Sequence, residues 1–139
     1  MKSKLFSIGF TSLLALVVAA PAAFSSSSSY SFTLDNRVVD GSKNGQYHNL
    51  SKGSATISGK QHQYSSDPKP VGPNTISYQL WNKSSGNSFG VVKSVPNSDG
   101  TSNSVKGTYS GLGGGSKYYL LIFRTDDGRN IKGSGTVSN

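Results

Sequence analysis

Residues that commonly carry catalysis are scarce in this sequence. His48 and His62 are the 2 histidines, cysteine is absent, and all 6 acidic residues are aspartate. A nucleophile-and-base site needs a histidine oriented by a carboxylate beside a serine, threonine or cysteine. Five of the 6 aspartates lie in predicted turns, where this side chain ordinarily bonds to nearby backbone. We therefore expect no catalytic residues and a protein that is not an enzyme.

The sequence also offers little for a metal or a cofactor. His48 and His62 lie in separate segments without a metal-binding spacing. Asp126-Asp127-Gly128 and Asn97-Ser98-Asp99-Gly100 supply oxygen atoms, but neither has the full ligand set of a calcium loop, and turns explain both. Gly113-Gly114-Gly115 is not followed by the Lys-Ser or Lys-Thr pair of a phosphate loop. We expect no metal site and no cofactor.

Aromatic side chains and lysines form the best candidate for a binding site. Trp81 lies on the polar side of its predicted strand, and Tyr119 and Phe123 lie on the corresponding side of another. An outward aromatic row flanked by lysines suits stacking on sugar rings or insertion into a lipid surface. The alternative is that Trp81 packs beneath a loop as part of the core. The candidate ligand-binding residues are Trp81, Lys83, Lys117, Tyr119, Phe123 and Lys132.

The chain is strongly basic, with a net charge of +8. Two of the 14 basic residues, Lys2 and Lys4, lie at the start of the chain. Without these two, 12 basic residues and 6 aspartates remain, which gives a net charge of +6. These lysines and arginines are spread along the chain, which suits a solvated surface or attraction to polyanions outside a cell. We expect an anionic polysaccharide, wall polymer or lipid surface as partner, and no specific nucleic acid, because no basic-aromatic motif is present.

The N-terminus has the layout of a secretory signal. Met1 to Lys4 contains two lysines, Leu5 to Ala20 is uncharged and largely apolar, and small residues follow up to Ala23. The apolar stretch is shorter than the roughly 18 to 20 residues that span a bilayer. We predict a cleaved signal peptide over 1–23, a flexible Ser-rich segment over 24–29, and a secreted product that is not membrane-spanning.

Residues 30–139 are predicted to form one all-β domain. Glycine, serine and asparagine are abundant, and strong helix formers are rare beyond the leader. Alternating patterns predict strands separated by turns, and the proline-rich segment Ser65 to Asn74 is predicted to be an extended loop. The predicted strands are 30–34, 37–39, 54–58, 61–64, 75–81, 88–95, 105–109, 118–123 and 129–137.

Two of these strands carry further expectations. Tyr118 to Phe123 is apolar on both faces, which predicts a position in the middle of a sheet. Asp126-Asp127-Gly128 predicts a hairpin between that strand and Arg129 to Val137. A two-residue turn places Ile131 on the side of Tyr118, whereas a three-residue turn places it on the opposite side, so the register stays open with a slight preference for the first.

The strand spacing predicts a single antiparallel β-sandwich of about 7–9 short strands, immunoglobulin-like or jelly-roll-like, after the cleaved signal peptide. Leu112 to Tyr119 joins a Gly-rich stretch to tyrosines at the head of an apolar strand. This segment of about a dozen residues resembles the corner before a late strand of immunoglobulin-like sandwiches. The resemblance implies a fold and no activity.

Together these features predict a secreted, cationic, non-enzymatic β-sandwich that binds an anionic cell-envelope or polysaccharide partner, with an antimicrobial or competition role as one form of that function. Two alternatives stay open. One is an extracellular structural or matrix protein that assembles through sheet edges. The other is a secreted protease inhibitor that presents a loop such as Ser65 to Asn74 or Leu112 to Lys117. The sequence leaves the oligomeric state undetermined.

Overall fold

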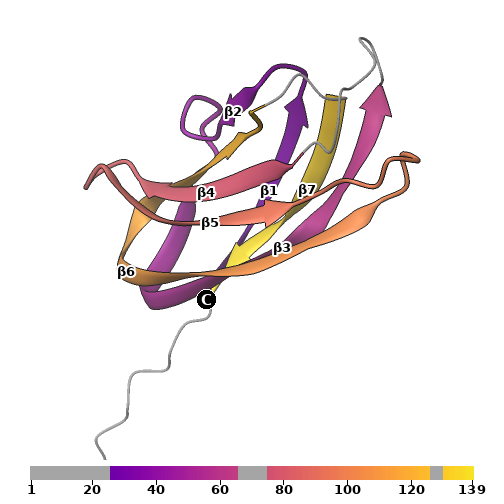
Figure 1. Cartoon of the computed structure of the whole chain (residues 1–139). Coiled ribbons are helices and arrows are strands. Elements are labelled where there is room, and N and C mark those ends of the chain that lie inside the picture. Colours follow the sequence, from indigo (N-terminus) through magenta and orange to yellow (C-terminus); the bar gives the residue numbers. More distant parts are fainter. Residues whose placement is uncertain (1–25, 66–74, 126–129) are drawn as a thin grey trace, which may run out of the picture.

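The structure is a computed structural model, and it describes residues 26–65, 75–125 and 130–139. Within these ranges the regular structure consists of β-strands (Figure 1). None of the described residues belongs to a helix with the length and apolar character needed to cross a membrane. The strands are β1 (Ser27–Leu34), β2 (Val38–Asp40), β3 (His48–Ser65), β4 (Ile76–Asn82), β5 (Asn87–Ser94), β6 (Asn103–Phe123) and β7 (Asn130–Ser138).

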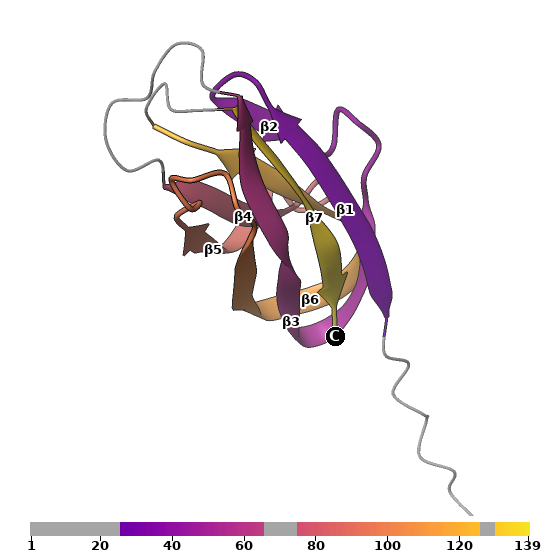
Figure 2. The ribbon, with the colours of Figure 1, turned by 90° about the vertical axis from the view of Figure 1, so that its right-hand side faces the viewer.

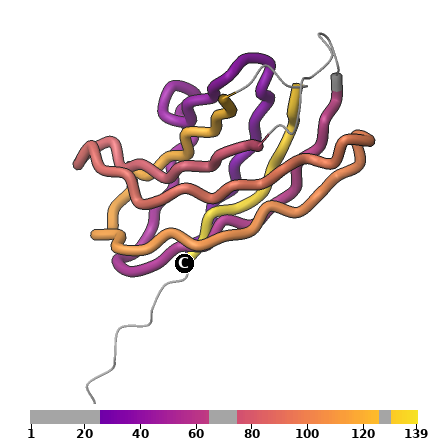
Figure 3. Tube along the Cα trace, viewed as in Figure 1, coloured from indigo at the N-terminus to yellow at the C-terminus, as the bar shows by residue number. Residues whose placement is uncertain are grey.

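The strands form an antiparallel β-sandwich, as the sequence predicts. Their order is β1-β7-β3-β6-β4-β5, and β2 pairs with β6 beside this path. Figures 1 and 2 show β1, β7 and β3 in one layer and β4 and β5 in the other, and the trace in Figure 3 follows β6 from one layer to the other. Residues 103–118 of β6 pair with β3, and its last six residues pair with β4.

β3 and β6 are longer than the sequence predicts. The segments 54–58 and 61–64 belong to one strand of 18 residues, and 105–109 and 118–123 belong to one strand of 21. The glycine run does not end the strand, but the pairing with β3 shifts register on both sides of it, between Gly53 and Ala55 and between His48 and Leu50. Gly111, Gly114 and Gly115 take positive φ values, which allow β6 to bend here. The prediction of a loop over Leu112 to Lys117 is therefore wrong, whereas the central position of 118–123 is confirmed by its pairing with β2 and β4.

The predicted corner before Tyr118 has one feature of the immunoglobulin-like type. The backbone N–H of Gly114 donates to the Tyr118 hydroxyl at 3.1 Å, so the tyrosine bonds back to the chain just upstream of it. Here, however, this segment is a bend inside β6 and not a link between two strands.

The predicted C-terminal hairpin is wrong. β7 pairs with β1 and with β3, and β6 is not its hydrogen-bonded neighbour. Over 118–123 β6 is already paired with β4 on one edge, and over 121–123 with β2 on the other. Ile131 and Val137 nevertheless point into the same core as Tyr118, because β7 lies in the opposite layer with its apolar side inward. Residues 126–129, where the turn is predicted, lie outside the described residues, as do 1–25 and 66–74.

β1 starts earlier than predicted. Ser27, Ser28 and Ser29 pair with Ser138, Val137 and Thr136, so this part of the expected flexible segment is strand. The side chains of a serine run carry no apolar periodicity, and only the neighbouring β7 reveals the pairing.

The core fills the space between the two layers. Its centre is Tyr78, whose hydroxyl donates to Gln61 Oε1 and whose carbonyl accepts a 2.8 Å hydrogen bond from the Tyr109 hydroxyl. Burial raises the pKa of both tyrosines far above the ordinary value. The amide of Gln61 donates to Ser94 Oγ at 2.9 Å, so these interior polar groups have partners. The buried apolar residues are Tyr30, Phe32, Leu34, Leu50, Ala55, Ile57, Ile76, Tyr78, Leu80, Val105, Tyr109, Leu112, Tyr118, Leu120, Ile122, Ile131 and Val137.

Aromatic rings on β1 lie over glycines on β7. Tyr30 is paired with Gly135 and Phe32 with Gly133, and the two rings stack with centroids 6.5 Å apart. A Cβ at Gly135 would come within 2.1 Å of the Ser58 carbonyl oxygen, so the close approach of β3 requires a glycine. Burial raises the pKa of the Tyr30 hydroxyl to about 12.

This contact predicts the effect of adding one methyl group to β7. Gly135→Ala should lower the free energy of unfolding by about 2 to 3 kcal/mol, because the new Cβ meets backbone that cannot move aside. Gly113→Ala is the matched control, since its Cβ would have no neighbour within 4 Å, and it should change stability by less than about 0.5 kcal/mol. Urea unfolding followed by tryptophan fluorescence measures both, and equal stability of the two variants would contradict the packing described.

Candidate binding surface

The outer face of β4 and β6 carries aromatic side chains at one end. Ile76, Tyr78 and Leu80 point inward, so strand alternation turns Trp81 outward. Trp81 is directly opposite Tyr119 on β6. Both rings are partly exposed, and the indole N–H of Trp81 is buried without a partner among the described residues. Trp81 is therefore half-buried, with its N–H inside and part of its ring at the surface.

A third ring and two lysines complete this group. Tyr47 precedes β3 and stands edge-on to Tyr119, with ring centroids 6.4 Å apart. The Lys117 ammonium lies 5.0 Å from the Tyr47 ring centroid, and the Lys83 ammonium lies 5.9 Å from it. The backbones of the two lysines are also joined, because Lys83 N–H donates to the Lys117 carbonyl at 2.9 Å. We call Tyr47, Trp81, Lys83, Lys117 and Tyr119 the aromatic-lysine cluster.

The electrostatics of this cluster favour positive charge. The pKa of Lys83 is raised, first by its hydrogen bond to Tyr47 and then by the electrostatic influence of Tyr47 and of Asp40. The pKa of Tyr119 is raised by partial burial and by Asp40. Asp40 is engaged in its own turn, where Oδ1 accepts from the backbone N–H of Ser42 at 2.9 Å and from its hydroxyl at 2.7 Å. At neutral pH Lys83 is a cation and Tyr119 a neutral ring.

The structure brings together four of the six predicted site residues. Trp81, Lys83, Lys117 and Tyr119 meet in the cluster. Phe123 lies further along β6, at its last residue, where it is paired with Ser77 on one side and Val38 on the other.

Lys132 lies in the other layer. It is on β7, with its ammonium 4.4 Å from the Tyr64 ring centroid. Tyr47 is the cluster member that sequence reasoning missed. It lies just after a turn and outside any alternating pattern, so only the tertiary structure places it over the lysines.

Ser28 and His48 form a pair that sequence reasoning also missed. The Ser28 hydroxyl and His48 Nδ1 are 2.6 Å apart, a geometry that a serine nucleophile and its base share. His48 Nε2 is buried without a hydrogen-bond partner among the described residues, so no carboxylate orients the ring there. Burial lowers the pKa of His48 to about 4, which makes it a weak base at neutral pH. The arrangement fits a structural hydrogen bond between β1 and β3.

Gly86-Asn87-Ser88-Phe89-Gly90 matches the Gly-x-Ser-x-Gly pattern of a nucleophile elbow. That elbow requires a sharp turn from a strand into a helix. Ser88 instead lies inside β5, paired with Trp81, and the strand continues to Ser94. The match therefore carries no catalytic geometry.

Metal-ligating side chains do not gather in the part of the chain that is described, where no group of three His, Cys, Asp or Glu comes together. Asp99 is a turn residue, because its Oδ1 accepts from the Thr101 backbone at 2.9 Å and from the Thr101 hydroxyl at 2.6 Å. These hydrogen bonds, that of the side chain first, lower the pKa of Asp99. The second predicted calcium candidate, at Asp126, lies outside the described residues.

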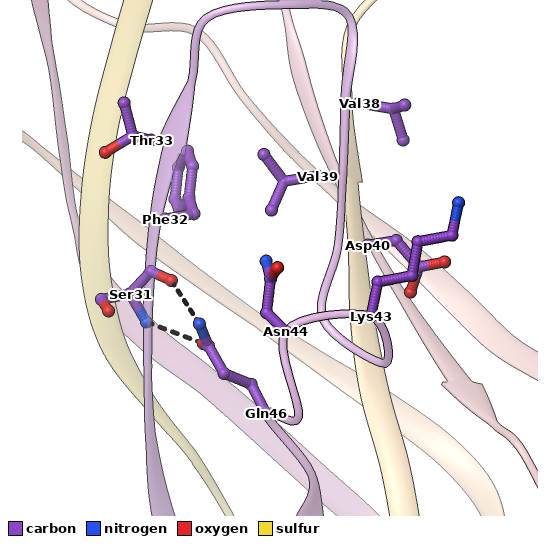
Figure 4. A pocket seen from close by; sticks show the side chains of 9 residues that line it. All are labelled: Ser31, Phe32, Thr33, Val38, Val39, Asp40, Lys43, Asn44 and Gln46. Carbon is purple, nitrogen blue, oxygen red and sulfur yellow. Dashed lines mark hydrogen bonds between the residues drawn. The ribbon is translucent and has the colours of Figure 1, made fainter.

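A groove of about 590 Å³ lies between β1 and β2 (Figure 4). Phe32 and Val39 flank it, and Asp40, Lys43 and Asn44 lie on the side of the 41–46 turn. It is separate from the aromatic-lysine cluster, apart from Asp40, which influences Lys83 and Tyr119.

Comparison with known proteins gives similarity of structure only. No family model matches the sequence, and no curated protein matches it significantly. A carbohydrate binding module from Cellvibrio mixtus lichenase 5A, solved in complex with cellotriose, is 13% identical with a TM-score of 0.48, over 80% of this chain and 87% of that one. The core of Drosophila NLP, solved for insight into pentamer formation and histone binding, is 9% identical with a TM-score of 0.38, over 79% and 94%.

The buried His48 predicts a loss of stability in mild acid. Its pKa is about 4 in the folded chain against an ordinary 6.5, so below pH 6.5 the unfolded chain binds the proton more strongly. Stability is intact above pH 6.5 and falls as the pH drops toward 4, by about 2 kcal/mol between pH 7 and pH 5. Urea unfolding at these pH values should show this decrease, and His48→Gln should remove it. A wild-type unfolding free energy that is constant from pH 7 to pH 5 would contradict the prediction.

Proposed function

We propose that the protein binds an anionic polysaccharide through the aromatic-lysine cluster. The observation that carries this proposal is that Lys83 and Lys117 both lie within 6 Å of the Tyr47 ring, beside the paired rings of Trp81 and Tyr119. A surface with rings and cations side by side can recognise a ligand that has both an apolar face and a negative charge.

The rings supply the contact with the sugar. Trp81 and Tyr119 are neighbours on adjacent strands, so the sheet holds them in place and little conformational entropy is lost on binding. A sugar ring presents C–H groups on its faces, and aromatic rings are the side chains that pack against such faces with large contact area. Tyr47 stands edge-on to Tyr119 and forms a second wall.

The lysines supply attraction to the acidic group of the ligand. Contact with Tyr47 orients both ammonium groups, and Lys83 is a cation at neutral pH. Lysine is compact and strongly hydrated, so binding to a carboxylate or sulfate is expected to weaken as salt is added. A net positive chain adds a general attraction to polyanions.

We place this binding outside the producing cell and assign it no catalysis. The leader-like pattern of 1–23 supports the location. The lack of catalysis is supported by His48, which is a weak base and whose Nε2 has no carboxylate partner among the described residues. Acidic polysaccharides and wall polymers of a cell envelope are the ligands of this class, and an antimicrobial or competition role is one use of such binding.

Polygalacturonate tests the proposal, because each of its sugar rings carries a carboxylate. We expect measurable binding at low ionic strength in isothermal titration calorimetry, and weaker binding as salt rises. Trp81→Ala should weaken the affinity about tenfold through loss of ring contact. The double variant Lys83→Ala/Lys117→Ala should weaken it by a similar factor and reduce its salt dependence.

Lys132→Ala is the matched control. Lys132 also lies over a tyrosine, but in the opposite layer, so its loss removes one charge and one lysine-tyrosine contact without touching the cluster. It should bind polygalacturonate as the wild type does, apart from a small general effect of charge. Absence of binding at low ionic strength, or an equal loss in Lys132→Ala and in the cluster variants, would rule out the proposed surface.

A further inference from the structure

The edge of β1 is open to a partner strand. β1 is the first strand of the sheet order, and among the described strands it pairs only with β7. In an antiparallel strand, alternate residues direct their backbone N–H and C=O groups to opposite sides. The Ser26 carbonyl bonds to Asn139 on the β7 side, so Ser27, Ser29, Ser31 and Thr33 direct their backbone groups away from β7.

One side chain occupies the middle of this edge. The Ser31 N–H donates to Gln46 Oε1 at 3.1 Å, and Gln46 Nε2 donates back to the Ser31 carbonyl at 3.0 Å (Figure 4). A residue of an adjacent antiparallel strand would make the same two hydrogen bonds with its backbone. The carboxamide of Gln46 has the same donor and acceptor groups as a peptide bond, so it stands in for a partner strand.

The edge on both sides of Gln46 is accessible. The groove of Figure 4 borders Thr33, and a second hollow of about 590 Å³ borders Ser29 over the outer face of β1 and β7. The backbone groups of Ser29 and Thr33 on this side have no hydrogen-bond partner among the described residues. Beyond Gln46, the nearest described chain on this side is β2 and the 41–46 turn, which lie across the groove from β1 (Figure 4).

The side chains of this edge fit a second copy of the same chain. Charged residues and prolines are the usual obstacles to edge-to-edge pairing, and β1 contains neither. Its outward side chains are serines and one threonine, which are small and uncharged. In an antiparallel pair centred on Ser31, Ser29 of each copy lies opposite Thr33 of the other, so the edge is complementary to itself. The net positive charge of the chain opposes close approach elsewhere, and this neutral edge avoids that repulsion.

We propose that Gln46 is a plug that keeps two copies of this protein from joining through their β1 edges. When the plug is absent, Ser31 and its neighbours pair with β1 of a second copy and the β1-β7-β3 layer continues into that copy. This surface is separate from the aromatic-lysine cluster, and the inference does not rest on the proposed function.

Sedimentation velocity over a concentration series tests the plug. The wild type should remain monomeric where Gln46→Ala dimerises, with a dimer dissociation constant at least about tenfold lower for the variant. Gln46→Met keeps the bulk of the side chain without its amide and should behave as Gln46→Ala does, so a folding defect of the alanine variant does not decide the result. Asn44→Ala is the matched control, because Asn44 lines the same groove without bonding to β1, and it should stay monomeric.

A charge placed on the edge identifies the surface. Ser31→Lys added to Gln46→Ala or to Gln46→Met puts two lysines opposite each other at the centre of the pair, and it should restore the monomer. Circular dichroism confirms that each variant is folded. A folded Gln46→Met that stays monomeric, a wild type that dimerises as strongly as the variants, or dimers that persist after Ser31→Lys would each overturn the proposal.

Discussion

The fold depends on one strand that belongs to both layers. β6 pairs with β3 over 103–118 and with β4 and β2 through its last residues, and the glycines at 111, 114 and 115 let it bend. Once β6 takes this path, its last residues have β4 on one edge and β2 on the other. The last strand must then pair elsewhere, which explains why β7 lies between β1 and β3. The same path sets Tyr119 opposite Trp81, so the candidate surface follows from how β6 is bent.

A core without disulfides is stabilised here by close backbone packing and by interior hydrogen bonds. Glycines on β3 and β7 allow the strands to approach, and the rings of Tyr30 and Phe32 cover them. Tyr78, Gln61 and Ser94 form a hydrogen-bonded chain that links β4, β3 and β5. Because buried polar groups without partners are costly, this chain specifies the packing of those strands as well as contributing to stability.

The two proposed surfaces lie on different parts of the sandwich and have different chemistry. The aromatic-lysine cluster is cationic and lies on the outer face of the β4 layer, and its geometry suits a polymer with rings and negative charges. The β1 edge is neutral and belongs to the other layer, and its backbone groups suit another strand. Asp40 lies between them, since it lines the groove beside β1 and also acts on Lys83.

The sequence by itself determined the all-β class, the inward sides of the strands and the cationic character, because strand alternation and charge are local properties of residue types. It also singled out Trp81 and Tyr119, because their outward direction can be read from the strand pattern, and Lys83 and Lys117, because they flank these rings in the sequence. It did not separate these from Phe123 and Lys132, because the distance between strands depends on sheet order. Only the tertiary structure decided that Tyr47 joins the cluster, that β7 leaves β6 for β1 and β3, and that Gln46 bonds to Ser31. Each of these is a contact between segments distant in sequence, and no local periodicity encodes it.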